Sequence, residues 1–282
     1  MLLDCGGKPL DLSAPRIMGV LNLTPDSFSD GGRFDAPERA IAQALQMQAD
    51  GAAIIDIGGE STRPGADHVA VEEEIDRVVP VIERLSKREF DPEPLLSIDT
   101  RKAAVAEAAL EAGADVVNDV SGLEDPEMRF VAAEYDVPLC LMHSIDAPVV
   151  PGRTVTYDDV VEDVIDQLTE RILLAEKAGL TREQLVVDPG IGFGKRSHES
   201  FELLGRLEEF RSLGCPILVG HSHKSMFDRI GCGPDERRDA TVAATALAVD
   251  RGADIVRVHD VPENVAAVKT ALAVGDPETV GK

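Results

Sequence analysis

The chain has 282 residues, of which 52 are acidic and 28 are Lys or Arg, and its formal net charge is −24. A surface this negative repels phosphate backbones and anionic lipids, so neither nucleic acid nor a membrane is an expected partner. An acidic excess with few lysines is typical of halophilic proteins, which work in high salt where their self-repulsion is screened.

Hydrophobic residues make up 44% of the chain, enough to form the core of one large α/β barrel or of two smaller domains. The four cysteines include no C-x-x-C pair, which argues against a disulfide scaffold or a zinc ribbon. The N-terminus shows no basic stretch followed by a long apolar one, and no segment reaches the ~18 apolar residues of a membrane span. We therefore expect a cytoplasmic protein.

After a short leader, apolar runs that predict buried strands alternate with segments whose apolar residues recur at helical spacing. The expected strands cover residues 16–22, 52–59, 95–100, 115–120, 137–143, 185–188, 216–220 and 254–258. The expected helices cover residues 37–50, 69–87, 101–112, 126–135, 157–178, 201–213, 235–251 and 262–274.

Eight short, nearly all-apolar strands that alternate with eight helices predict a (β/α)8 barrel with eight parallel strands, because parallel strands are buried on both faces. The length also fits this fold, and no linker divides the chain, so we expect one domain over residues 1–282. A doubly wound open sheet is the alternative. It is disfavoured because no G-x-G-x-x-G motif follows the first strand.

The connection after the first strand, residues 22–32, is longer than the usual βα connection of about two to six residues, and such loops often carry function. In a (β/α)8 barrel the active site forms from the loops at the C-terminal ends of the strands. Each of these ends is polar or charged here: Asn22; Glu60, Thr62 and Arg63; Asp99; Asn118 and Asp119; His143; Asp188; Ser222 and Lys224; Arg257 and His259. Any one of them, Asp99 in particular, could simply cap a helix, but convergence of all on one face indicates a site, since unpaired buried charge is costly.

The charges at these strand ends fall into two groups. Arg257 and His259 are two residues apart on the last strand and therefore point to one side, where Asn22 from the adjoining strand could complete an anion pocket. Asp99, Asn118 and Asp188 offer two carboxylates and an amide, which suit a heterocycle rich in N–H donors. The two groups together indicate a phosphorylated, nitrogen-rich heterocycle as substrate.

Seven motifs along the chain, in one order, closely resemble the dihydropteroate synthase family. They are NLTPDSFSDGG (22–32), GGESTRPG (58–65), SIDT (97–100), NDVSG (118–122), DPGIGFGK (188–195), GHSHKSM (220–226) and RVHDV (257–261). The resemblance implies condensation of 6-hydroxymethyl-7,8-dihydropterin diphosphate with 4-aminobenzoate to give 7,8-dihydropteroate and diphosphate, in folate biosynthesis. It also implies a homodimer that uses Mg²⁺.

The resemblance also implies a role for individual residues. It places the pterin ring against Asp99, Asn118, Asp188 and Lys224, with Met142 and Phe193 nearby. It assigns the diphosphate to Asn22, Arg63, Arg257 and His259, with Mg²⁺ at Asn22, and the aminobenzoate to Ser222 at a helix start, Pro64 and Phe193. Thr62 and Arg63 would close over the reacting centre, so the catalytic set is Arg63, Thr62, Lys224 and Asp99.

These residues fit an SN1-like course. Cations around the diphosphate assist its departure, and the carboxylates favour the positive charge left on the pterin methylene. Two departures from the family pattern, His223 in place of an arginine and the segment 144–148, concern the affinity for aminobenzoate.

Three other functions compete with this interpretation. The first is a methyltransferase that passes a methyl group from a methyl-pterin to a corrinoid protein, which would have no need of an anion pocket. The second is a metal-dependent hydrolase that uses His143, His221, His223 and His259. The third is a non-catalytic pterin-binding barrel, against which the presence of Arg63 argues.

Overall fold

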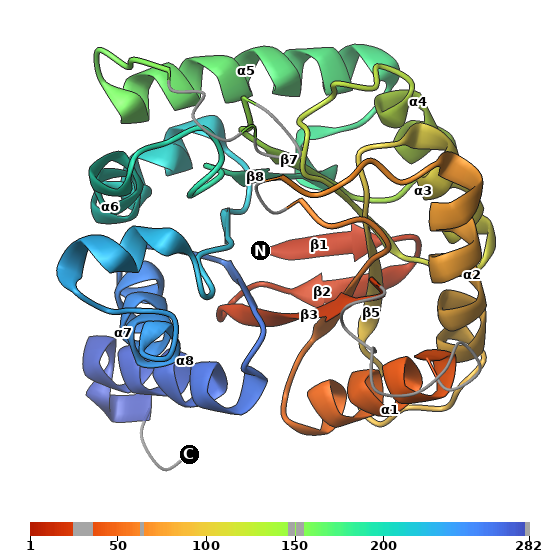
Figure 1. Cartoon of the computed structure of the whole chain (residues 1–282), viewed down its shortest axis with the longest axis horizontal. Helices are drawn as coiled ribbons and strands as arrows, with labels where there is room; N and C mark the ends of the chain where they lie inside the picture. Colours follow the sequence, from red (N-terminus) through yellow and green to blue (C-terminus); the bar gives the residue numbers. More distant parts are fainter. Residues whose placement is uncertain (25–35, 63–64, 146–149, 151–154, 280–282) are drawn as a thin grey trace.

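The computed structural model describes residues 1–24, 36–62, 65–145, 150 and 155–279. Its main sheet is eight-stranded, and each strand pairs in parallel with its neighbours in the order β8-β7-β6-β5-β4-β3-β10-β9 (Figure 1). The strands are β3 (Arg16–Asn22), β4 (Ile54–Gly58), β5 (Leu95–Asp99), β6 (Val116–Asp119), β7 (Leu139–Met142), β8 (Leu185–Asp188), β9 (Leu218–Val219) and β10 (Ile255–Val258). Within the described residues, one parallel bridge, between Val187 and Ile217, joins the two ends of the sheet and closes the predicted barrel.

Helices follow the strands and surround the barrel (Figure 1). They are α1 (Ala36–Ala49), α2 (Val71–Ser86), α3 (Ala103–Glu111), α4 (Met128–Glu134), α5 (Val160–Ala178), α6 (Ser197–Gly205), α7 (Arg237–Asp250) and α8 (Val261–Gly275). The boundaries of α5 follow from local chemistry. Asp159 accepts hydrogen bonds from the backbone N–H groups of Val161 and Glu162 at 2.9 and 3.1 Å, and Gly179 ends the helix at φ 113°.

The helix expected over residues 201–213 is displaced. The α-helix α6 ends at Gly205, and the 3₁₀ helix η3 (Leu207–Leu213) continues the segment. Three further 3₁₀ helices are η2 (Arg182–Gln184), η4 (Ser225–Ile230) and η5 (Pro277–Thr279). The short helix η4 begins immediately after Lys224, one of the predicted site residues.

The expectation of a short leader at the N-terminus was wrong. The first residues form an antiparallel hairpin, β1 (Leu2–Cys5) and β2 (Lys8–Asp11), which Figure 1 shows across the middle of the ring of helices. Alternate hairpin residues pack into a buried cluster with one residue from each barrel strand: Leu3, Cys5, Leu10, Leu12, Met18, Ile54, Leu95, Val116, Cys140, Val186, Leu218 and Ile255. The hairpin thus covers the N-terminal end of the barrel with apolar side chains.

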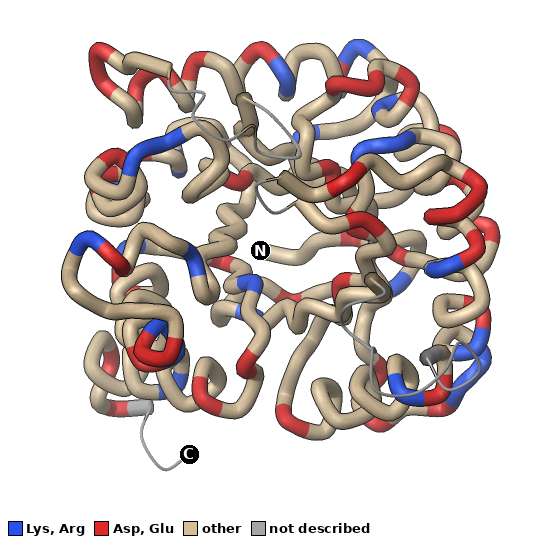
Figure 2. Tube along the Cα trace, in the orientation of Figure 1, with Lys and Arg blue, Asp and Glu red and all other residues tan. Residues whose placement is uncertain are grey.

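Figure 2 shows Asp and Glu spread over the outer helices, as the net charge of −24 requires. Within the described part of the chain, no helix is both long and apolar enough to cross a membrane.

Candidate active site

The strand register brings the predicted site residues to one level of the barrel. Asn22 on β3 pairs with Gly58, Gly58 with Asp99 on β5, and Asp99 with Asn118 on β6. On the other side of the barrel, Met142 at the end of β7 pairs with Asp188 at the end of β8. Parallel strands in register therefore place these side chains at one end of the barrel, as predicted.

At the centre of this end, Arg257 bridges two carboxylates. Its Nε lies 2.6 Å from Oδ2 of Asp56 on β4, and its Nη2 donates to Oδ2 of Asp99. Burial raises the pKa of Asp99 to about 7 against the attraction of Arg257, and the negative charge of Asp56 raises it further. Burial acts to lower the pKa of Arg257, but Asp56 and Asp99 together raise it above its ordinary value.

Asp56, which is fully buried in the middle of β4, is not among the predicted site residues. Besides Arg257, it accepts hydrogen bonds from Ser97 Oγ at 2.6 Å and from Asn118 Nδ2 at 3.1 Å. A signal was present, because a carboxylate inside the apolar run AAIIDIGG must find buried donors. Because Asp56 lies inside the strand, the pattern of polar strand ends does not include it.

Asp188 and Lys224 form the second charged group of the site. Asp188 is 5% exposed, and its Oδ1 accepts a hydrogen bond from the backbone N–H of Gly190 at 2.7 Å. Burial raises the pKa of Asp188, while Lys224 acts in the opposite direction. Burial lowers the pKa of Lys224 to about 8 against the attraction of Asp188, and its ammonium lies 4.4 Å from the centre of the Phe193 ring and donates to the carbonyl of Ile191.

A second lysine, Lys195, holds the loop that follows β8 against His143, the residue after β7. Lys195 Nζ lies 2.7 Å from Nδ1 of His143 and 2.8 Å from the carbonyl oxygens of both His143 and Gly190. Gly190 has φ 67°, and a Cβ there would lie 1.8 Å from the His143 carbonyl oxygen, so only glycine fits. Burial lowers the pKa of His143 to about 2, with Lys195 contributing, so its ring stays neutral.

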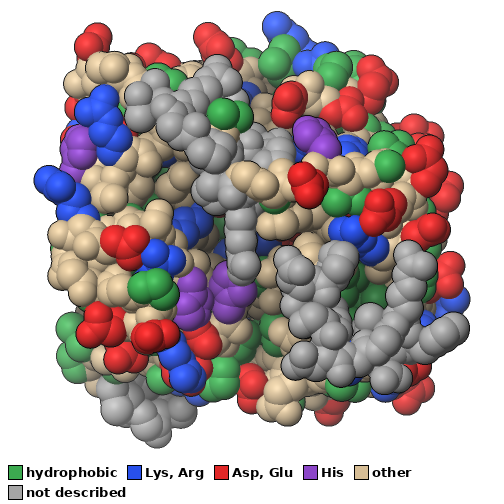
Figure 3. All heavy atoms as spheres, viewed as in Figure 1, with side chains coloured by type: hydrophobic (Ala, Val, Ile, Leu, Met, Phe, Trp, Pro, Cys, Tyr) green, Lys and Arg blue, Asp and Glu red, His purple; other side chains and the backbone are tan. Residues whose placement is uncertain are grey.

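Ser222 and His259 are adjacent, but Ser222 is not at a helix start as expected. The Oγ of Ser222 accepts a hydrogen bond from the backbone N–H of His259 at 3.2 Å and lies 2.9 Å from its Nδ1, and the helix η4 begins only at Ser225. His223 lies beside them, with Nε2 2.5 Å from Oδ2 of Asp260 and its ring 5.4 Å from that of His259. Figure 3 shows two histidine side chains side by side on this face.

Comparison with known proteins agrees with this geometry. Residues 18–259 match the family model described as "Pterin binding enzyme". The chain is 44% identical over 274 residues to the dihydropteroate synthase of Escherichia coli, covering 97% of this chain and 96% of that one. The chain belongs to the dihydropteroate synthase family.

Solved structures support the same family. The Xanthomonas albilineans dihydropteroate synthase with 4-aminobenzoic acid superposes with a TM-score of 0.90 at 45% identity and 98% coverage of both chains. The same enzyme in complex with 7,8-dihydropteroate gives a TM-score of 0.88 at 42% identity, with 98% of this chain and 99% of that one covered.

A longer relative occurs in Haloferax volcanii, a probable bifunctional folylpolyglutamate synthase/dihydropteroate synthase. It is 66% identical over 261 residues, covering 93% of this chain but only 31% of that protein. The chain thus spans about a third of the length of this relative.

Some of the predicted family residues fall outside the part of the chain that the structure describes. Arg63 and Pro64 lie outside the described residues, as do most of the connection 22–32 and part of the segment 144–148. Thr62 is described and half-buried, and Asn22 is half-buried at the end of β3.

Two of the polar strand-end residues have structural roles instead. Glu60 lies 2.9 Å from Arg101 Nε and 3.3 Å from Lys102 Nζ, at the start of α3. Asp119 accepts hydrogen bonds from the backbone N–H groups of Ser121 and Leu123 in its own turn.

The side chains of the four histidines of the hydrolase hypothesis have different hydrogen-bond partners. His143 contacts Lys195, and His221 Nε2 lies 2.9 Å from Thr245 Oγ1. His223 contacts Asp260, and His259 contacts Ser222. Among the described residues, no three His, Cys, Asp or Glu side chains are close enough together to hold a metal ion.

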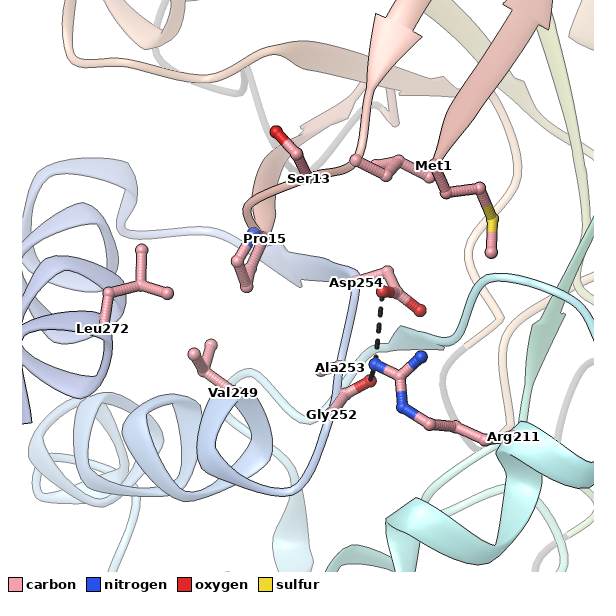
Figure 4. A pocket seen from close by; sticks show the side chains of 10 residues that line it. Met1, Ser13, Pro15, Arg211, Val249, Gly252, Ala253, Asp254 and Leu272 are labelled. Atoms are coloured by element: carbon pink, nitrogen blue, oxygen red, sulfur yellow. Dashed lines mark hydrogen bonds and ion pairs between the residues drawn. The ribbon is translucent and has the colours of Figure 1, made fainter. Parts of the chain in front are cut away.

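A pocket of about 400 Å³ lies at the opposite end of the barrel (Figure 4). There Arg211 Nη2 lies 3.4 Å from Oδ1 of Asp254 and donates to the Gly252 carbonyl at 2.9 Å. The lining includes none of the predicted site residues that the structure describes: it consists of Met1, Leu12, Ser13, Pro15, Arg211, Val249, Gly252, Ala253, Asp254 and Leu272.

Proposed function

We propose that the chain is a dihydropteroate synthase, a transferase that condenses 6-hydroxymethyl-7,8-dihydropterin diphosphate with 4-aminobenzoate to give 7,8-dihydropteroate and diphosphate. The observation that carries the proposal is the junction at Arg257, where one guanidinium contacts both Asp56 and Asp99 while His259 follows two residues later on the same chain. Carboxylates that can accept N–H donors therefore lie next to Arg257 and His259, which can donate to an anion. Relatives that are 44–49% identical carry the same function in their names.

The pterin ring fits the carboxylate side of this junction. Asp99 and Asp188 accept N–H donors of the ring, with Asn118 between them on β6. Lys224 and Phe193 already lie together on one side, where they offer a cation and an aromatic face. Met142 is buried at the adjoining end of β7 and completes an apolar wall.

The diphosphate fits the other side, where Arg257 and His259 supply donors and Asn22 lies at the end of the neighbouring strand β3. The donor set near Asn22 fits Mg²⁺ only as an ion that arrives with the substrate, because Mg²⁺ usually keeps several waters and takes its other oxygens from phosphates and one or two protein groups. When bound, Mg²⁺ would neutralise charge on the departing diphosphate.

The chain's own residues support a dissociative course. Arg257 and His259 hold the leaving group, and the carboxylates of Asp99 and Asp188 favour the positive charge that develops on the pterin methylene. The aryl amine of 4-aminobenzoate then attacks this carbon, the bond to the diphosphate oxygen having broken, and the amine proton leaves to water. We place Ser222 and Phe193, with Pro64, beside the aminobenzoate, and Thr62 and Arg63 over the reacting centre.

We also propose a homodimer in a cytoplasm of high salt. Helices α7 and α8 expose large apolar side chains, Leu247 at 51%, Leu272 at 39% and Val274 at 73%, which a second copy could cover. The net charge of −24 and the similarity to the Haloferax volcanii protein support the high-salt setting. Sedimentation in molar KCl tests the dimer, and a monomer at micromolar concentration would contradict it.

The decisive experiment measures diphosphate release from dihydropterin diphosphate with Mg²⁺ in molar KCl, with and without 4-aminobenzoate, for the wild type and Arg257→Ala. Release that requires the aryl amine, yields dihydropteroate and collapses in the variant supports the synthase. A methyltransferase or a non-catalytic barrel would bind the pterin without releasing diphosphate. Release that ignores 4-aminobenzoate would contradict the second substrate.

A further inference from the structure

Asp56 connects the two halves of the proposed site from behind the residues that would line it. It is fully buried, and it contacts side chains from three other strands: Ser97 on β5, Asn118 on β6 and Arg257 on β10. Two of these three, Asn118 and Arg257, belong to the residues that would contact the substrate. One carboxylate therefore holds a pterin-side residue and a diphosphate-side residue together.

The hydrogen bonds divide between the two carboxylate oxygens. Oδ1 accepts from Ser97 Oγ at 2.6 Å, and Oδ2 is shared by Asn118 Nδ2 at 3.1 Å and Arg257 Nε at 2.6 Å. Three donors, one of them cationic, offset the cost of burying the carboxylate. An ionised carboxylate only accepts hydrogen bonds, so every group that faces it must turn a donor towards it.

This requirement fixes the amide of Asn118. If the amide were rotated by half a turn, its oxygen would face Oδ2 of Asp56 and repel it. Only one of the two flipped orientations of the Asn118 amide is therefore allowed, so its oxygen and its second N–H face the ligand in fixed positions. An amide that could flip freely would offer a donor or an acceptor at the same position, so it would bind a 2-amino and a 2-oxo ring edge equally well.

The same carboxylate fixes the plane of the Arg257 guanidinium. That group is planar, and it is held at two points, through Nε to Asp56 and through Nη2 to Asp99. Without the Asp56 contact the guanidinium could turn about its bond to Asp99. Arg257 would then lose the fixed direction in which it presents its remaining donors to the diphosphate.

We propose that Asp56 is a positioning residue that sets the donor and acceptor order of Asn118 and the plane of Arg257, and so determines the selectivity of the site for the 2-amino ring edge of a pterin. The inference rests on the proposed function, since it assigns Asn118 to the pterin. It concerns discrimination between ring edges and not the ability to bind a flat heterocycle.

The test compares binding of 6-hydroxymethylpterin with that of 6-hydroxymethyllumazine, in which an oxo group replaces the 2-amino group. Titration calorimetry in molar KCl gives the ratio of the two dissociation constants for the wild type and Asp56→Asn. We expect the preference for the pterin to fall at least about tenfold in the variant, because the amide introduced by the substitution accepts either orientation of Asn118. The matched control is Ser97→Ala, which removes a donor to the same carboxylate but leaves Asn118 and Arg257 in place, and it should keep the wild-type ratio.

A wild-type ratio in a folded Asp56→Asn protein would overturn the proposal and leave Asp56 as a purely structural residue. If Asp56→Asn does not fold, the double variant Asp56→Asn/Arg257→Ala removes both charges, which buried pairs tolerate better than the loss of one partner. Its ratio is then compared with that of Arg257→Ala, and equal ratios would likewise overturn the proposal. Failure of the wild type to bind either compound would instead contradict the proposed function itself.

Discussion

The two ends of the barrel are built from the same strands but differ completely in chemistry. At the N-terminal end, one apolar residue from each strand packs beneath the hairpin β1–β2. Two residues further along, on the same interior face, five of these strands carry polar or charged residues. The pairs are Ile54 and Asp56, Leu95 and Ser97, Val116 and Asn118, Val186 and Asp188, and Ile255 and Arg257.

Along each of these five strands, the residue expected to contribute to stability and the residue in the polar layer are two positions apart. The apolar layer holds the barrel together by burial. In the polar layer, Asp56 accepts hydrogen bonds from Ser97, Asn118 and Arg257, and Asp188 accepts one from the backbone of Gly190. Substitutions in the first layer should change the free energy of unfolding, whereas substitutions of Asn118, Asp188 and Arg257 in the second layer should change substrate binding.

The largest effect is expected at Asp188. Asp188→Ala should weaken binding of 6-hydroxymethylpterin about 100-fold, which corresponds to the ~3 kcal/mol typical of losing hydrogen bonds to a charged group. The matched control is Val186→Ala on the same strand and face, which should lower the free energy of unfolding by ~1–3 kcal/mol and leave the dissociation constant within about twofold. Calorimetry and urea unfolding measure the two quantities. A comparable loss of affinity in both variants would remove the distinction between the layers.

The hairpin should act on stability alone. Leu3 is 1% exposed beneath the barrel, so Leu3→Ala should lower the free energy of unfolding by ~3 kcal/mol, because it leaves a cavity in a packed cluster. Leu2, its exposed neighbour at 64%, provides the control, and Leu2→Ala should change stability by less than ~0.5 kcal/mol. Both variants should keep the wild-type kcat. A fall in kcat for Leu3→Ala would show that the hairpin influences the other end.

The acid limb of the pH profile should report Asp99. Because burial raises its pKa to about 7, kcat/KM should rise as the pH increases through 7 and the carboxyl ionises. Asp56→Asn removes a negative charge that raises this pKa, so the limb should move to lower pH, with Arg257, Glu74 and Asp119 unchanged. Asp99→Asn should abolish the limb, and a limb that persists there would assign it to another group.

The raised pKa of Asp99 should also make the free energy of unfolding depend on pH, but in the opposite direction to kcat/KM. The folded chain holds the Asp99 proton more tightly than the unfolded chain, where the ordinary value is 3.8. The contribution of Asp99 to the free energy of unfolding therefore falls as the pH rises from about 4 to about 7.

The smallest effect is expected at His223, where the sequence departs from the family pattern. Its ring packs edge-on against His259 and is tied to Asp260. His223→Ala should raise the KM for dihydropterin diphosphate about 2- to 10-fold, as the loss of an aromatic contact worth ~0.5–1.5 kcal/mol implies. The KM for 4-aminobenzoate should stay within about twofold. A larger change in the second KM would place His223 at the aminobenzoate instead, as the resemblance to the family pattern implies.

The barrel itself could be predicted because each strand and helix carries its own periodic signal. The hairpin could not, because Leu2–Cys5 and Lys8–Asp11 are each only 4 residues long. The two glycines between them, Gly6 and Gly7 at φ 61° and 88°, were a turn signal that the short flanking runs concealed. The hairpin becomes stable only once it packs on the barrel.

The positions of the candidate residues at the ends of strands could be predicted from the sequence, but the position of Asp56 inside a strand could not. Asp99, Asn118 and Asp188 stand at the borders of apolar runs, so a pattern locates them. Asp56 lies within a run, and its importance depends on donors from distant parts of the chain, with Arg257 201 positions away. Ser222 illustrates the converse, since only the structure shows that its hydroxyl contacts His259 and that η4 starts at Ser225.

The closure of the barrel between β8 and β9 should couple ligand binding to the local stability of this part of the fold. Among the described residues, strand pairing across this seam is limited to the bridge of Val187 with Ile217, whereas β3 and β4 pair over five positions. Amide hydrogens at the seam should therefore exchange with solvent sooner than those of β3 and β4, through local opening. Asp188 lies on one side of the seam and Lys224 on the other, so a pterin that contacts both residues would link the two sides and stabilise the closed barrel. Occupancy of the site should then raise the melting temperature and slow exchange at the seam.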